Sequence, residues 1–266
     1  MSAHDNTPTG RRVALVLAGS KGLGRACADA LADSGFDVVV CARSADDTDA
    51  TVAALRERGS MASGVTADVS SADDLERLFA HVDEVHGRLD VLVANAGGPP
   101  PGPILDLDDD DWRTGFELTL MSAVRAIRHA VPRMRASGYG RIVVLGSSSV
   151  RQPIPNLGLS NAYRPALAGV VKSLSVDLAP EGITVNMVSP GRVATERVAS
   201  LDQRAAEREG ISAADARARS EATIPMGRYG QPEELGAMVA FLAGPSAGYV
   251  TGETILVDGG LVRSLP

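Results

Sequence analysis

Cysteines and long apolar segments are scarce in this 266-residue sequence. Its two cysteines, Cys27 and Cys41, do not form a CxxC spacing, which argues against a disulfide framework or a metal site. We interpret both as thiols of the hydrophobic core. No apolar run approaches the roughly 18 residues that suggest a membrane span, and the polar residues 1–10 lack the apolar segment of a signal peptide. We therefore expect residues 1–10 to form a flexible tail on a cytoplasmic protein with no membrane partner.

An excess of positive charge is also missing. The chain has 26 Lys and Arg residues against 33 Asp and Glu residues, which gives a formal net charge of -7, and it has no basic stripe. This balance favours a small-molecule partner over a nucleic acid. Solubility alone would account for the negative charge equally well.

The sequence does contain an alternation of short apolar runs and amphipathic helical stretches. The runs include VALVLAG, DVVVCAR, DVLVANAG, RIVVLGS, ITVNMVSPG and TILVDGG. Such alternation predicts an α/β fold with a doubly wound parallel sheet and helices on both faces. Continuous Val, Leu and Ile indicate strands that are buried on both faces. Glycines are expected to end several helices, namely Gly35, Gly59, Gly87 and Gly138.

No internal repeat or linker divides the chain, so residues 11–266 are expected to form a single domain. One long stretch, at about 192–231, is rich in Arg, Ala and Glu. An irregular connection of that length in a compact domain is usually a functional lid or a disordered segment, and we expect a lid. Its arginines, Arg192 and Arg197 first, are candidates to meet an anionic substrate. Alternatively, they pair with acidic residues of the same stretch, such as Glu196, Glu207 and Glu209.

A glycine-rich segment, LAGSKGLGRA at residues 17–26, follows the first apolar run and opens the first helical stretch. In that context backbone N–H groups at a helix N-terminus can hold a pyrophosphate. The alternative is a glycine turn kept only for packing between helix and strand. Four further segments, VVVCARS, ADV, ANAG and SPGRVAT, each end a predicted parallel strand. Ligands of open α/β sheets bind at these strand ends.

With these motifs the chain resembles the short-chain dehydrogenase/reductase family over roughly residues 11–262, and most of all its divergent members similar to 3-oxoacyl-carrier-protein reductases. The resemblance implies a Rossmann-type fold and a homo-oligomer, either a tetramer or a dimer. The family's TGxxxGxG loop aligns with Leu17 and Ala18 at its Thr and first Gly, and the later glycines are kept as Gly22 and Gly24. Because alanine tolerates a positive φ poorly, we expect Gly19 to relieve the turn one residue later.

The cofactor is predicted from charge. Arg43 ends the second apolar run and Lys21 lies in the glycine segment. An acidic residue would hydrogen-bond a ribose 2'-hydroxyl, whereas cations accommodate a 2'-phosphate. The sequence therefore favours NADP(H), unless both cations are ordinary solvated surface residues.

The resemblance also assigns cofactor-binding positions. The glycine segment and the end of the second strand are expected to bind the phosphates. The ends of the third and fourth strands would contact adenine and ribose, and the end of the sixth strand would contact the nicotinamide carboxamide. The residues are Gly19, Ser20, Lys21, Gly22, Leu23, Gly24, Arg43, Ser44, Asp68, Val69, Asn95, Ala96, Gly97, Pro190, Gly191, Val193 and Thr195, with Arg164 at the nicotinamide ribose.

The catalytic positions of the family are only partly kept. Most members have a Tyr, a Lys four residues later, a Ser thirteen residues before the Tyr, and an Asn on the preceding helix. An ungapped alignment on EGITVN places Ser160 and Arg164 at the Tyr and Lys positions and retains Ser147. Aligning the preceding helix on Trp112 places Thr119 at the Asn position. Arg164 can bind a ribose hydroxyl and hold positive charge, but with a pKa above about 12 it cannot relay protons.

Two residues are candidates for the missing proton donor. Ser160 is too weak an acid without an activating group, and its alternative role is a helix N-cap. Pro165 supports that role, because proline is tolerated in a first helical turn, so the helix is expected to begin late or irregularly. Tyr163 would lie about 60° around the helix from position 160. Its alternative role is packing against a neighbouring helix.

Two acidic or proline-rich segments are weaker candidates. GGPPPGPI, residues 97–104, is either a stiff wall beside the nicotinamide or a simple connection. DLDDDDW, residues 106–112, is expected to be a helix N-terminus whose carboxylates suit the helix dipole, with no metal implied.

Two functions follow from these residues. The first is an NADP(H)-dependent oxidoreductase that moves hydride between nicotinamide and a ketone or secondary alcohol. Ser147 would polarise the oxygen, and the proton would come from Tyr163, water or the substrate. The second is a non-redox protein on the same scaffold, such as a cyclase, isomerase, dehydratase or ligand-binding protein, because a fold alone does not decide a function.

Overall fold

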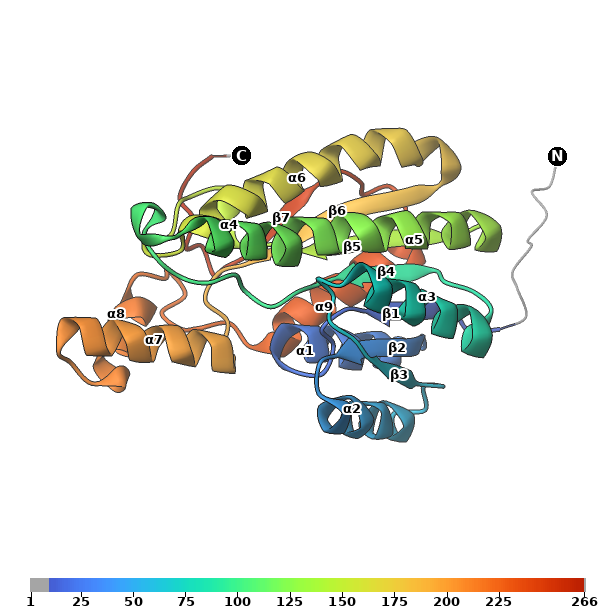
Figure 1. The fold of residues 1–266 in the computed structure, drawn as a ribbon, viewed down its shortest axis with the longest axis horizontal. Coiled ribbons are helices and arrows are strands. Elements are labelled where there is room, and N and C mark those ends of the chain that lie inside the picture. The colour runs from blue at the N-terminus through green and yellow to red at the C-terminus, as the bar shows by residue number, and fades with distance from the viewer. Residues whose placement is uncertain (1–9, 266) are drawn as a thin grey trace.

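Seven parallel strands form the central sheet in a computed structural model that describes residues 10–265 (Figure 1). The strand order is β3-β2-β1-β4-β5-β6-β7. Apart from Gly10, the predicted tail lies outside the described residues. The strands are β1 (Val13–Val16), β2 (Asp37–Ala42), β3 (Ser63–Thr66), β4 (Val91–Ala94), β5 (Gly140–Leu145), β6 (Ile183–Pro190) and β7 (Thr254–Val257). The predicted single-domain, doubly wound Rossmann-type α/β fold is confirmed.

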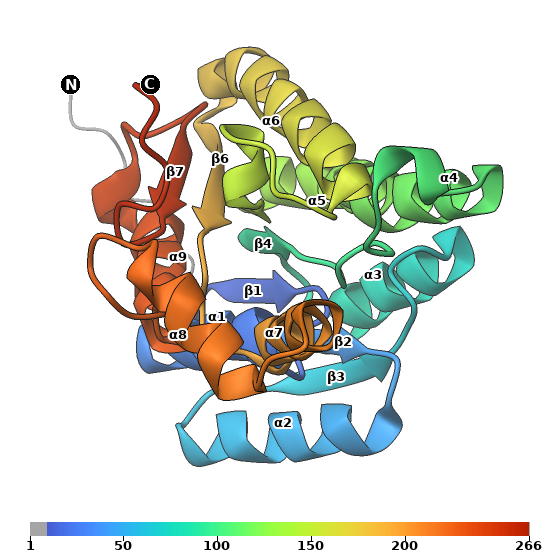
Figure 2. The same ribbon diagram turned by 90° about the vertical axis from the view of Figure 1, so that its left-hand side faces the viewer.

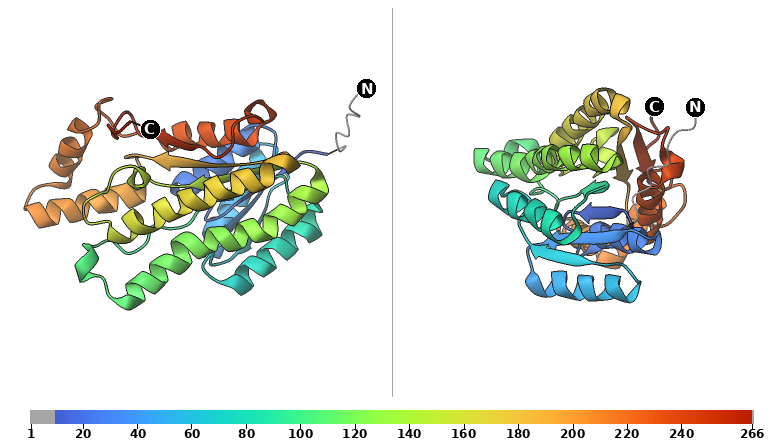
Figure 3. Two further views of the ribbon diagram at one scale, coloured as in Figure 1. Left: turned by 90° about the horizontal axis from the view of Figure 1, so that it is seen from above. Right: turned by 90° about the vertical axis from the view of Figure 1, so that its right-hand side faces the viewer.

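Helices cover both faces of the sheet (Figures 2 and 3). Strand side chains alternate between the two faces, so Leu15 packs with one helical layer and Val16 with the other. The layer on Val16 is α1 (Gly22–Asp33), α2 (Ala45–Glu57) and α9 (Pro232–Ala243). The opposite layer is α3 (Ala72–His86), α5 (Ser122–Ser137) and α6 (Gly158–Leu178), with α4 (Asp109–Phe116) leading into α5.

Glycines and cysteines behave as the sequence predicts. Gly87 and Gly138 are the left-handed C-caps of α3 and α5, and Gly35 and Gly59 take positive φ just beyond α1 and α2. Cys27 and Cys41 are buried free thiols, and burial raises the pKa of each to about 12. Among residues 10–265, no helix is both long and apolar enough to cross a membrane.

The stretch at 192–231 is helical, which corrects the expectation of an irregular segment. It contains α7 (Glu196–Glu209) and α8 (Ala213–Ala222), which project beyond the end of the sheet (Figure 1). Its Ala, Arg and Glu are strong helix formers. Thr195 and Ser212 cap the two helices through their side chains. Gly210 ends α7 in the left-handed conformation.

The strand order reverses at β1, which has β2 on one side and β4 on the other. Connections after β1 and β4 therefore run to opposite sides and leave a crevice at the carboxyl ends, where ligands bind in such sheets. In Figure 2, α7 and α8 lie in front of this end of the sheet. The fold thus places the predicted motifs at one edge, facing the two helices.

Candidate active site

The glycine loop after β1 makes its sharp turn at an alanine. Ala18 has φ +47° and Gly22 has φ +53°. Gly19 does not take a positive φ, which corrects its predicted role. A Cβ at Gly19 would lie 3.0 Å from the Val16 carbonyl oxygen and 3.0 Å from a Val40 methyl. The absence of a side chain at Gly19 therefore leaves room for the loop. The backbone of Ala18 carries the strain of a left-handed residue, roughly 1 kcal/mol.

The loop then folds tightly over the start of α1. A Cβ at Gly24 would lie 2.1 Å from the Ala18 carbonyl oxygen, so only glycine fits there. The Asn95 side chain, at the end of β4, donates to the same oxygen at 3.3 Å. The N-cap residue Lys21 makes no side-chain capping bond, and the first turn of α1 has no acidic residue. Its N–H groups and the positive end of the helix dipole remain available to an anion.

The predicted 2'-phosphate residues meet a carboxylate that sequence reasoning missed. Lys21 Nζ lies 2.9 Å from Asp47 Oδ2. This hydrogen bond raises the pKa of Lys21 and lowers the pKa of Asp47. Ser44 caps α2 by accepting from the Asp47 amide at 3.3 Å, and Arg43 is exposed beside it. The only signal for Asp47 was the preference for acidic residues in a first helical turn.

The other predicted cofactor residues lie at the same edge of the sheet. Asp68 Oδ1 accepts from the amide and hydroxyl of Ser70 at 2.9 and 2.7 Å, so that carboxylate is already engaged. Thr195 follows β6 and its methyl lies 3.6 Å from the position of a Cβ on Gly22. The structure therefore brings the glycine loop and the segment after β6 into contact.

Three serines form a connected group beside the end of β5. Ser147 Oγ accepts from the Ser149 amide at 3.2 Å. The Ser149 and Ser160 hydroxyls lie 3.1 Å apart, and Ser149 Oγ also lies 3.3 Å from the Ser160 carbonyl oxygen. Ser149 and Ser160 are buried, whereas Ser147 is partly exposed. The two predicted serines are thus linked through Ser149, which sequence reasoning missed and which only the run SSS after β5 signalled.

Ser160 is not a helix N-cap, which corrects that interpretation. Helix α6 begins at Gly158 with Leu157 as its N-cap, and it continues through Pro165. The Asn161 side chain accepts from the Ile154 amide at 2.9 Å and donates to the Ile154 carbonyl at 3.0 Å. These bonds hold the first turn of α6 in place, so Pro165 lies inside a helix that has already begun.

Tyr163 points toward α4. Its hydroxyl donates to the Trp112 carbonyl oxygen at 2.9 Å, and its ring meets the Trp112 ring edge-on with centroids 5.7 Å apart. Gly115 makes room for the ring, since a Cβ there would lie 3.1 Å from Tyr163 Cε2. Burial raises the pKa of the phenol. Tyr163 therefore packs against a neighbouring helix, which was the alternative to its role as proton donor. Its hydroxyl proton is directed to a main-chain carbonyl.

Arg164 is a buried cation with no acidic partner among residues 10–265. Its side chain donates from Nη1 to the Leu145 carbonyl oxygen, and its buried Nε has no partner. Burial, together with the charge of Arg197, lowers the pKa of Arg164 to about 10, so it remains charged near neutral pH.

The residue at the family's Asn position lies in a π-helical turn, Glu117–Met121, between α4 and α5. There the Thr119 hydroxyl is buried and unpartnered within the described part of the chain. Single π-helical turns occur frequently at functional sites. This turn contacts α6, the helix that carries Arg164, so Thr119 lies in an irregular stretch of backbone beside that helix.

A cavity of about 460 Å³ lies between α7, α8 and the segment after β5. Arg192 pairs with Asp202 at 3.1 Å, not with one of the predicted acids, and the Tyr229 hydroxyl also donates to Asp202 at 2.9 Å. The predicted pairing with Glu209 is confirmed for Arg208 and Arg219. The apolar part of the lining includes Pro153, Ile154, Pro155, Ala205, Leu261 and Val262.

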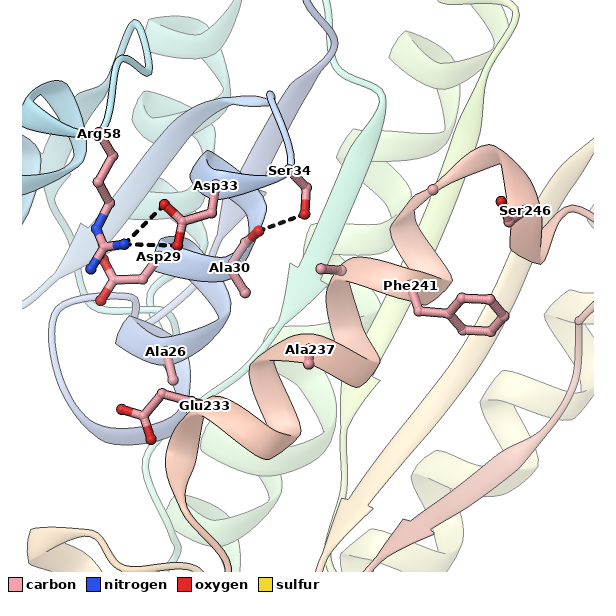
Figure 4. A pocket seen from close by; sticks show the side chains of 12 residues that line it. Ala26, Asp29, Ala30, Asp33, Ser34, Arg58, Glu233, Ala237, Phe241 and Ser246 are labelled. Atoms are coloured by element: carbon pink, nitrogen blue, oxygen red, sulfur yellow. Dashed lines mark hydrogen bonds and ion pairs between the residues drawn. The ribbon is translucent and has the colours of Figure 1, made fainter.

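A second cavity, of about 600 Å³, lies between α1 and α9 (Figure 4). It contains none of the predicted site residues. Its wall carries the Arg58–Asp33 ion pair at 2.7 Å, and Asp33 ends α1, far along the helix from the glycine loop. The candidate active site is therefore the crevice at the carboxyl ends of the strands together with the smaller cavity.

Comparisons with known proteins agree with this geometry. Residues 17–262 match the family described as enoyl-(acyl carrier protein) reductase. Dehydrogenase/reductase SDR family member 4 of Sus scrofa is 35% identical over 259 residues, which cover 97% of this chain and 90% of that protein. The chain belongs to the short-chain dehydrogenase/reductase family.

Solved structures of short-chain reductases resemble the whole chain. Actinorhodin polyketide ketoreductase with NADPH gives a TM-score of 0.91 at 38% identity, covering 94% of this chain and 97% of that one. L-sorbose reductase from Gluconobacter frateurii, complexed with NADPH and L-sorbose, gives a TM-score of 0.91 at 29% identity, covering 96% and 98%. The predicted fold family is confirmed by sequence and by structure.

Proposed function

We propose that this chain is an NADP(H)-dependent oxidoreductase that transfers a hydride between nicotinamide and a ketone or secondary alcohol, with an atypical proton donor. The observation that carries the proposal is the cradle at the start of α1. There a glycine loop, an uncapped helix N-terminus and Lys21 lie together, and the exposed Arg43 follows β2, the strand beside β1. The NADPH in two similar reductase structures supports the same cofactor.

The residues present fit this cofactor. The loop from Ala18 to Gly24 is too tight for a side chain at its close approach, as a pyrophosphate site on a helix N-terminus requires. Lys21 and Arg43 suit the 2'-phosphate, and the guanidinium of Arg164, whose Nε is unpartnered among the described residues, suits the hydroxyls of the nicotinamide ribose. When bound, the nicotinamide supplies or accepts the hydride.

Ser147 is positioned to hold the substrate oxygen. Its Oγ accepts from the Ser149 amide, so its own hydroxyl proton is free to be donated. Arg164, fixed to the end of β5 through Leu145, keeps a positive charge close by. A preorganised donor and a nearby cation stabilise the negative charge that develops on oxygen as a carbonyl accepts hydride.

The proton reaches the oxygen from water and not from Tyr163. The phenol donates to Trp112, and the Ser160 hydroxyl is turned toward Ser149. Arg164 stays protonated and does not act as an acid at neutral pH. Among residues 10–265, the atoms described around Ser147 therefore include no side chain suited to replace the family's tyrosine.

A second candidate is reduction of a carbon–carbon double bond conjugated to a carbonyl. The description of the matching family as an enoyl reductase favours it. Hydride would add to the β-carbon, the electron pair would move to the carbonyl oxygen held by Ser147, and solvent would protonate the α-carbon. This reaction needs an oxyanion site but no side-chain acid beside the oxygen.

Titration with NADPH and NADH, followed by protein fluorescence or calorimetry, tests the cofactor assignment. No binding of either at millimolar concentration would overturn the redox function and favour a non-redox member of the fold. If NADPH binds, its oxidation with matched ketones and enones separates the two candidate reactions. We expect Ser147→Ala to lower kcat by roughly 10²- to 10³-fold, the usual effect of losing one oxyanion donor, with NADPH affinity unchanged.

Assembly and location remain predictions. A homo-oligomer, tetramer or dimer, and a cytoplasmic location are expected from the family resemblance and the sequence. Light scattering coupled to size-exclusion chromatography measures the mass of the assembly directly. A single species at the monomer mass would contradict the predicted oligomer.

A further inference from the structure

One wall of the smaller cavity is a short segment that carries two prolines. Its five residues all line the cavity and form what we call the proline wall: Gln152, Pro153, Ile154, Pro155 and Asn156. Ser148 and Gly191 line the same cavity. Ser148 follows Ser147 in the chain, and Gly191 follows β6. The cavity therefore begins beside the segment whose hydroxyl we assign to the substrate oxygen.

The covalent structure of the proline wall leaves it few conformations. Each proline has a fixed φ and restricts the residue before it to extended conformations. Because the two prolines alternate with other residues, four positions in succession are restricted, 152–155. Asn156 then takes φ +60°, in the left-handed region where asparagine is enriched. The chain itself thus determines much of the shape of the wall.

The end of the wall is tied to the segment after β4. The Asn156 carbonyl oxygen accepts from the Gly102 amide at 2.8 Å. That segment is held in turn by Arg197 of α7, whose Nη2 donates to the Pro99 carbonyl oxygen at 3.1 Å. The Arg197 guanidinium lies against bare backbone, since a Cβ on Gly98 would be 2.8 Å from Nη2. Main-chain contacts therefore anchor this end of the proline wall.

Asn161, in the first turn of α6, holds the middle of the wall. Its side-chain oxygen accepts from the Ile154 amide at 2.9 Å, and its side-chain nitrogen donates to the Ile154 carbonyl oxygen at 3.0 Å. Within residues 10–265 the Ile154 amide has no other hydrogen-bond partner. The two bonds together fix the distance of Ile154 from α6 and the orientation of its backbone.

The start of α6 connects this contact to the group of serines. Ser160, the residue before Asn161, lies with its hydroxyl 3.1 Å from the Ser149 hydroxyl. The Ser149 amide in turn donates to Ser147 Oγ. Asn161 therefore sets the position of Ile154 relative to the hydroxyl that we assign to the substrate oxygen.

The remainder of the cavity offers an apolar surface between closed ion pairs. Arg192 pairs with Asp202 at 3.1 Å, and Arg219 pairs with Glu209 at 3.2 Å, so these charges have partners within the protein. Besides the proline wall, the apolar lining comes from α7, α8 and the C-terminal segment, namely Ala205, Ala216, Leu261 and Val262. Covering apolar surface from water is favourable in proportion to the area covered. The cavity therefore suits an apolar group.

We propose that Asn161 is a positioning residue for substrate selectivity. By holding Ile154 it keeps the proline wall in place, and the cavity takes an apolar group of the substrate, such as a phenyl ring joined to the reacting carbonyl by a short chain. This inference rests on the proposed function. The volume of about 460 Å³ lies in the range of small-molecule sites. Ordering a loose wall on binding costs affinity, so Asn161 acts on the affinity for the apolar group.

Two ketones that differ only in a phenyl group test the inference, 4-phenyl-2-butanone and 2-butanone. Ligand-observed NMR titration measures their dissociation constants, first without cofactor and then with saturating NADP⁺, which cannot reduce them. We expect wild type to bind the phenyl ketone roughly tenfold to a hundredfold more tightly, as burial of one aromatic group implies. Asn161→Ala should lower this preference to about threefold or less, because its wall must be ordered on binding. In turnover, this variant should raise KM for the phenyl ketone and change kcat by less than about twofold.

Two further variants test whether Asn161 acts through Ile154. Asn161→Asp keeps the acceptor for the Ile154 amide and loses the donor, so its preference should lie between those of wild type and Asn161→Ala. Ile154→Ala keeps both backbone bonds but removes the side chain from the wall, and it should lower the preference as well. The double variant of Asn161→Ala and Ile154→Ala should lose less than the sum of the two single losses. If Asn161→Ala does not fold, Asn161→Asp and Ile154→Ala decide by the same measurement.

Asn186→Ala is the matched control. Asn186 is buried and bonds in the same way, donating to the Val250 carbonyl oxygen at 2.8 Å and accepting from the Glu253 amide at 3.1 Å. None of these three residues lines the cavity. The control should lower stability and leave the preference for the phenyl ketone unchanged.

Equal binding of the two ketones by wild type would overturn the inference, as would an Asn161→Ala variant that keeps the preference. Additive losses in the double variant would overturn it too, because Asn161 would then not act through Ile154. So would an equal loss of preference in Asn186→Ala, since a general loss of stability would explain both. An Asn161-dependent preference in a protein that neither binds NADP⁺ nor oxidises NADPH would overturn only the proposed function.

Discussion

The hydroxyl of Tyr163 lies 2.9 Å from the main-chain carbonyl oxygen of Trp112 and donates a hydrogen bond to it. This bond ties α6 to α4 and keeps the phenol out of the group formed by Ser147, Ser149 and Ser160. A tyrosine three residues after the family's tyrosine position therefore has a structural role, and variants at this residue separate structure from catalysis.

Tyr163→Phe is expected to keep NADPH-dependent reduction within about threefold of wild type and to lower the free energy of unfolding by about 1 kcal/mol, the usual value of one hydrogen bond. The ring contact with Trp112 is retained in this variant, so the loss comes from the hydroxyl alone. Urea unfolding and steady-state rates measure the two effects. A hundredfold fall in kcat with unchanged stability would instead make Tyr163 the proton donor.

Ala18→Gly is expected to raise the free energy of unfolding by up to about 1 kcal/mol, because Ala18 has a positive φ that glycine adopts without strain. The matched control is Ala53→Gly in the middle of α2, at an exposed helical position. That substitution should lower stability by about 1 kcal/mol. Urea midpoints of the two variants should therefore move in opposite directions, and a shift in the same direction would refute the strain at Ala18.

Asp47→Asn is expected to tighten NADPH binding roughly threefold, an effect of the size that exposed charges usually have. Asp47 holds Lys21 at 2.9 Å and would repel the 2'-phosphate, so its removal frees the cation and ends the repulsion. NADH affinity should stay the same, because NADH lacks that phosphate. Asp46→Asn, next to it in the first turn of α2, is the control. Equal gains for NADPH and NADH would contradict this assignment.

Stability should fall as the pH drops below about 6.5 because of His86. Its Nε2 lies 2.9 Å from Ser63 Oγ, and its buried Nδ1 has no partner within residues 10–265. Burial lowers the pKa of His86 below its usual 6.5, an effect that the Asp37 carboxylate opposes and His81 adds to. The unfolded state therefore binds more protons than the folded state, so stability is complete above pH 6.5 and is lost as the pH falls toward the folded pKa.

Urea unfolding between pH 5 and 8 measures this dependence. His86→Gln, which does not titrate, should flatten the slope below pH 6.5. If the slope of stability against pH is unchanged in that variant, groups other than His86 cause the acid sensitivity. Ser63→Ala, which removes the hydroxyl between His81 and His86, should lower stability at every pH without removing the dependence on His86.

Much of the architecture was predictable because its signals are local. Apolar runs such as DVVVCAR become β2 since both faces of the strand are buried. Gly87 and Gly138 end helices since a left-handed residue is required there. The stretch at 192–231 is helical where we predict an irregular segment, because its composition favours helix. Thr195 and Ser212 were the capping residues that marked α7 and α8.

The candidate site was predictable only in its location. Parallel strands bring their carboxyl ends to one edge, so the motifs after β1, β2, β4, β5 and β6 had to meet there. The hydrogen-bond partners within that edge were not predictable. Asp47 pairs with Lys21 because α2 packs beside the glycine loop, and Ser149 meets Ser160 because α6 crosses the end of β5.

The sequence by itself determined the sheet, the glycine ends of several helices and the edge at which the predicted motifs meet, because hydrophobic period and glycine conformation are properties of short segments. Only the tertiary structure decided what each polar side chain does. The Tyr163 hydroxyl bonds to a residue 51 positions away, and Arg197 to one 98 positions away. Side-chain direction depends on the space left by elements distant in the chain, such as the gap at Gly115 and the bare backbone at Gly98.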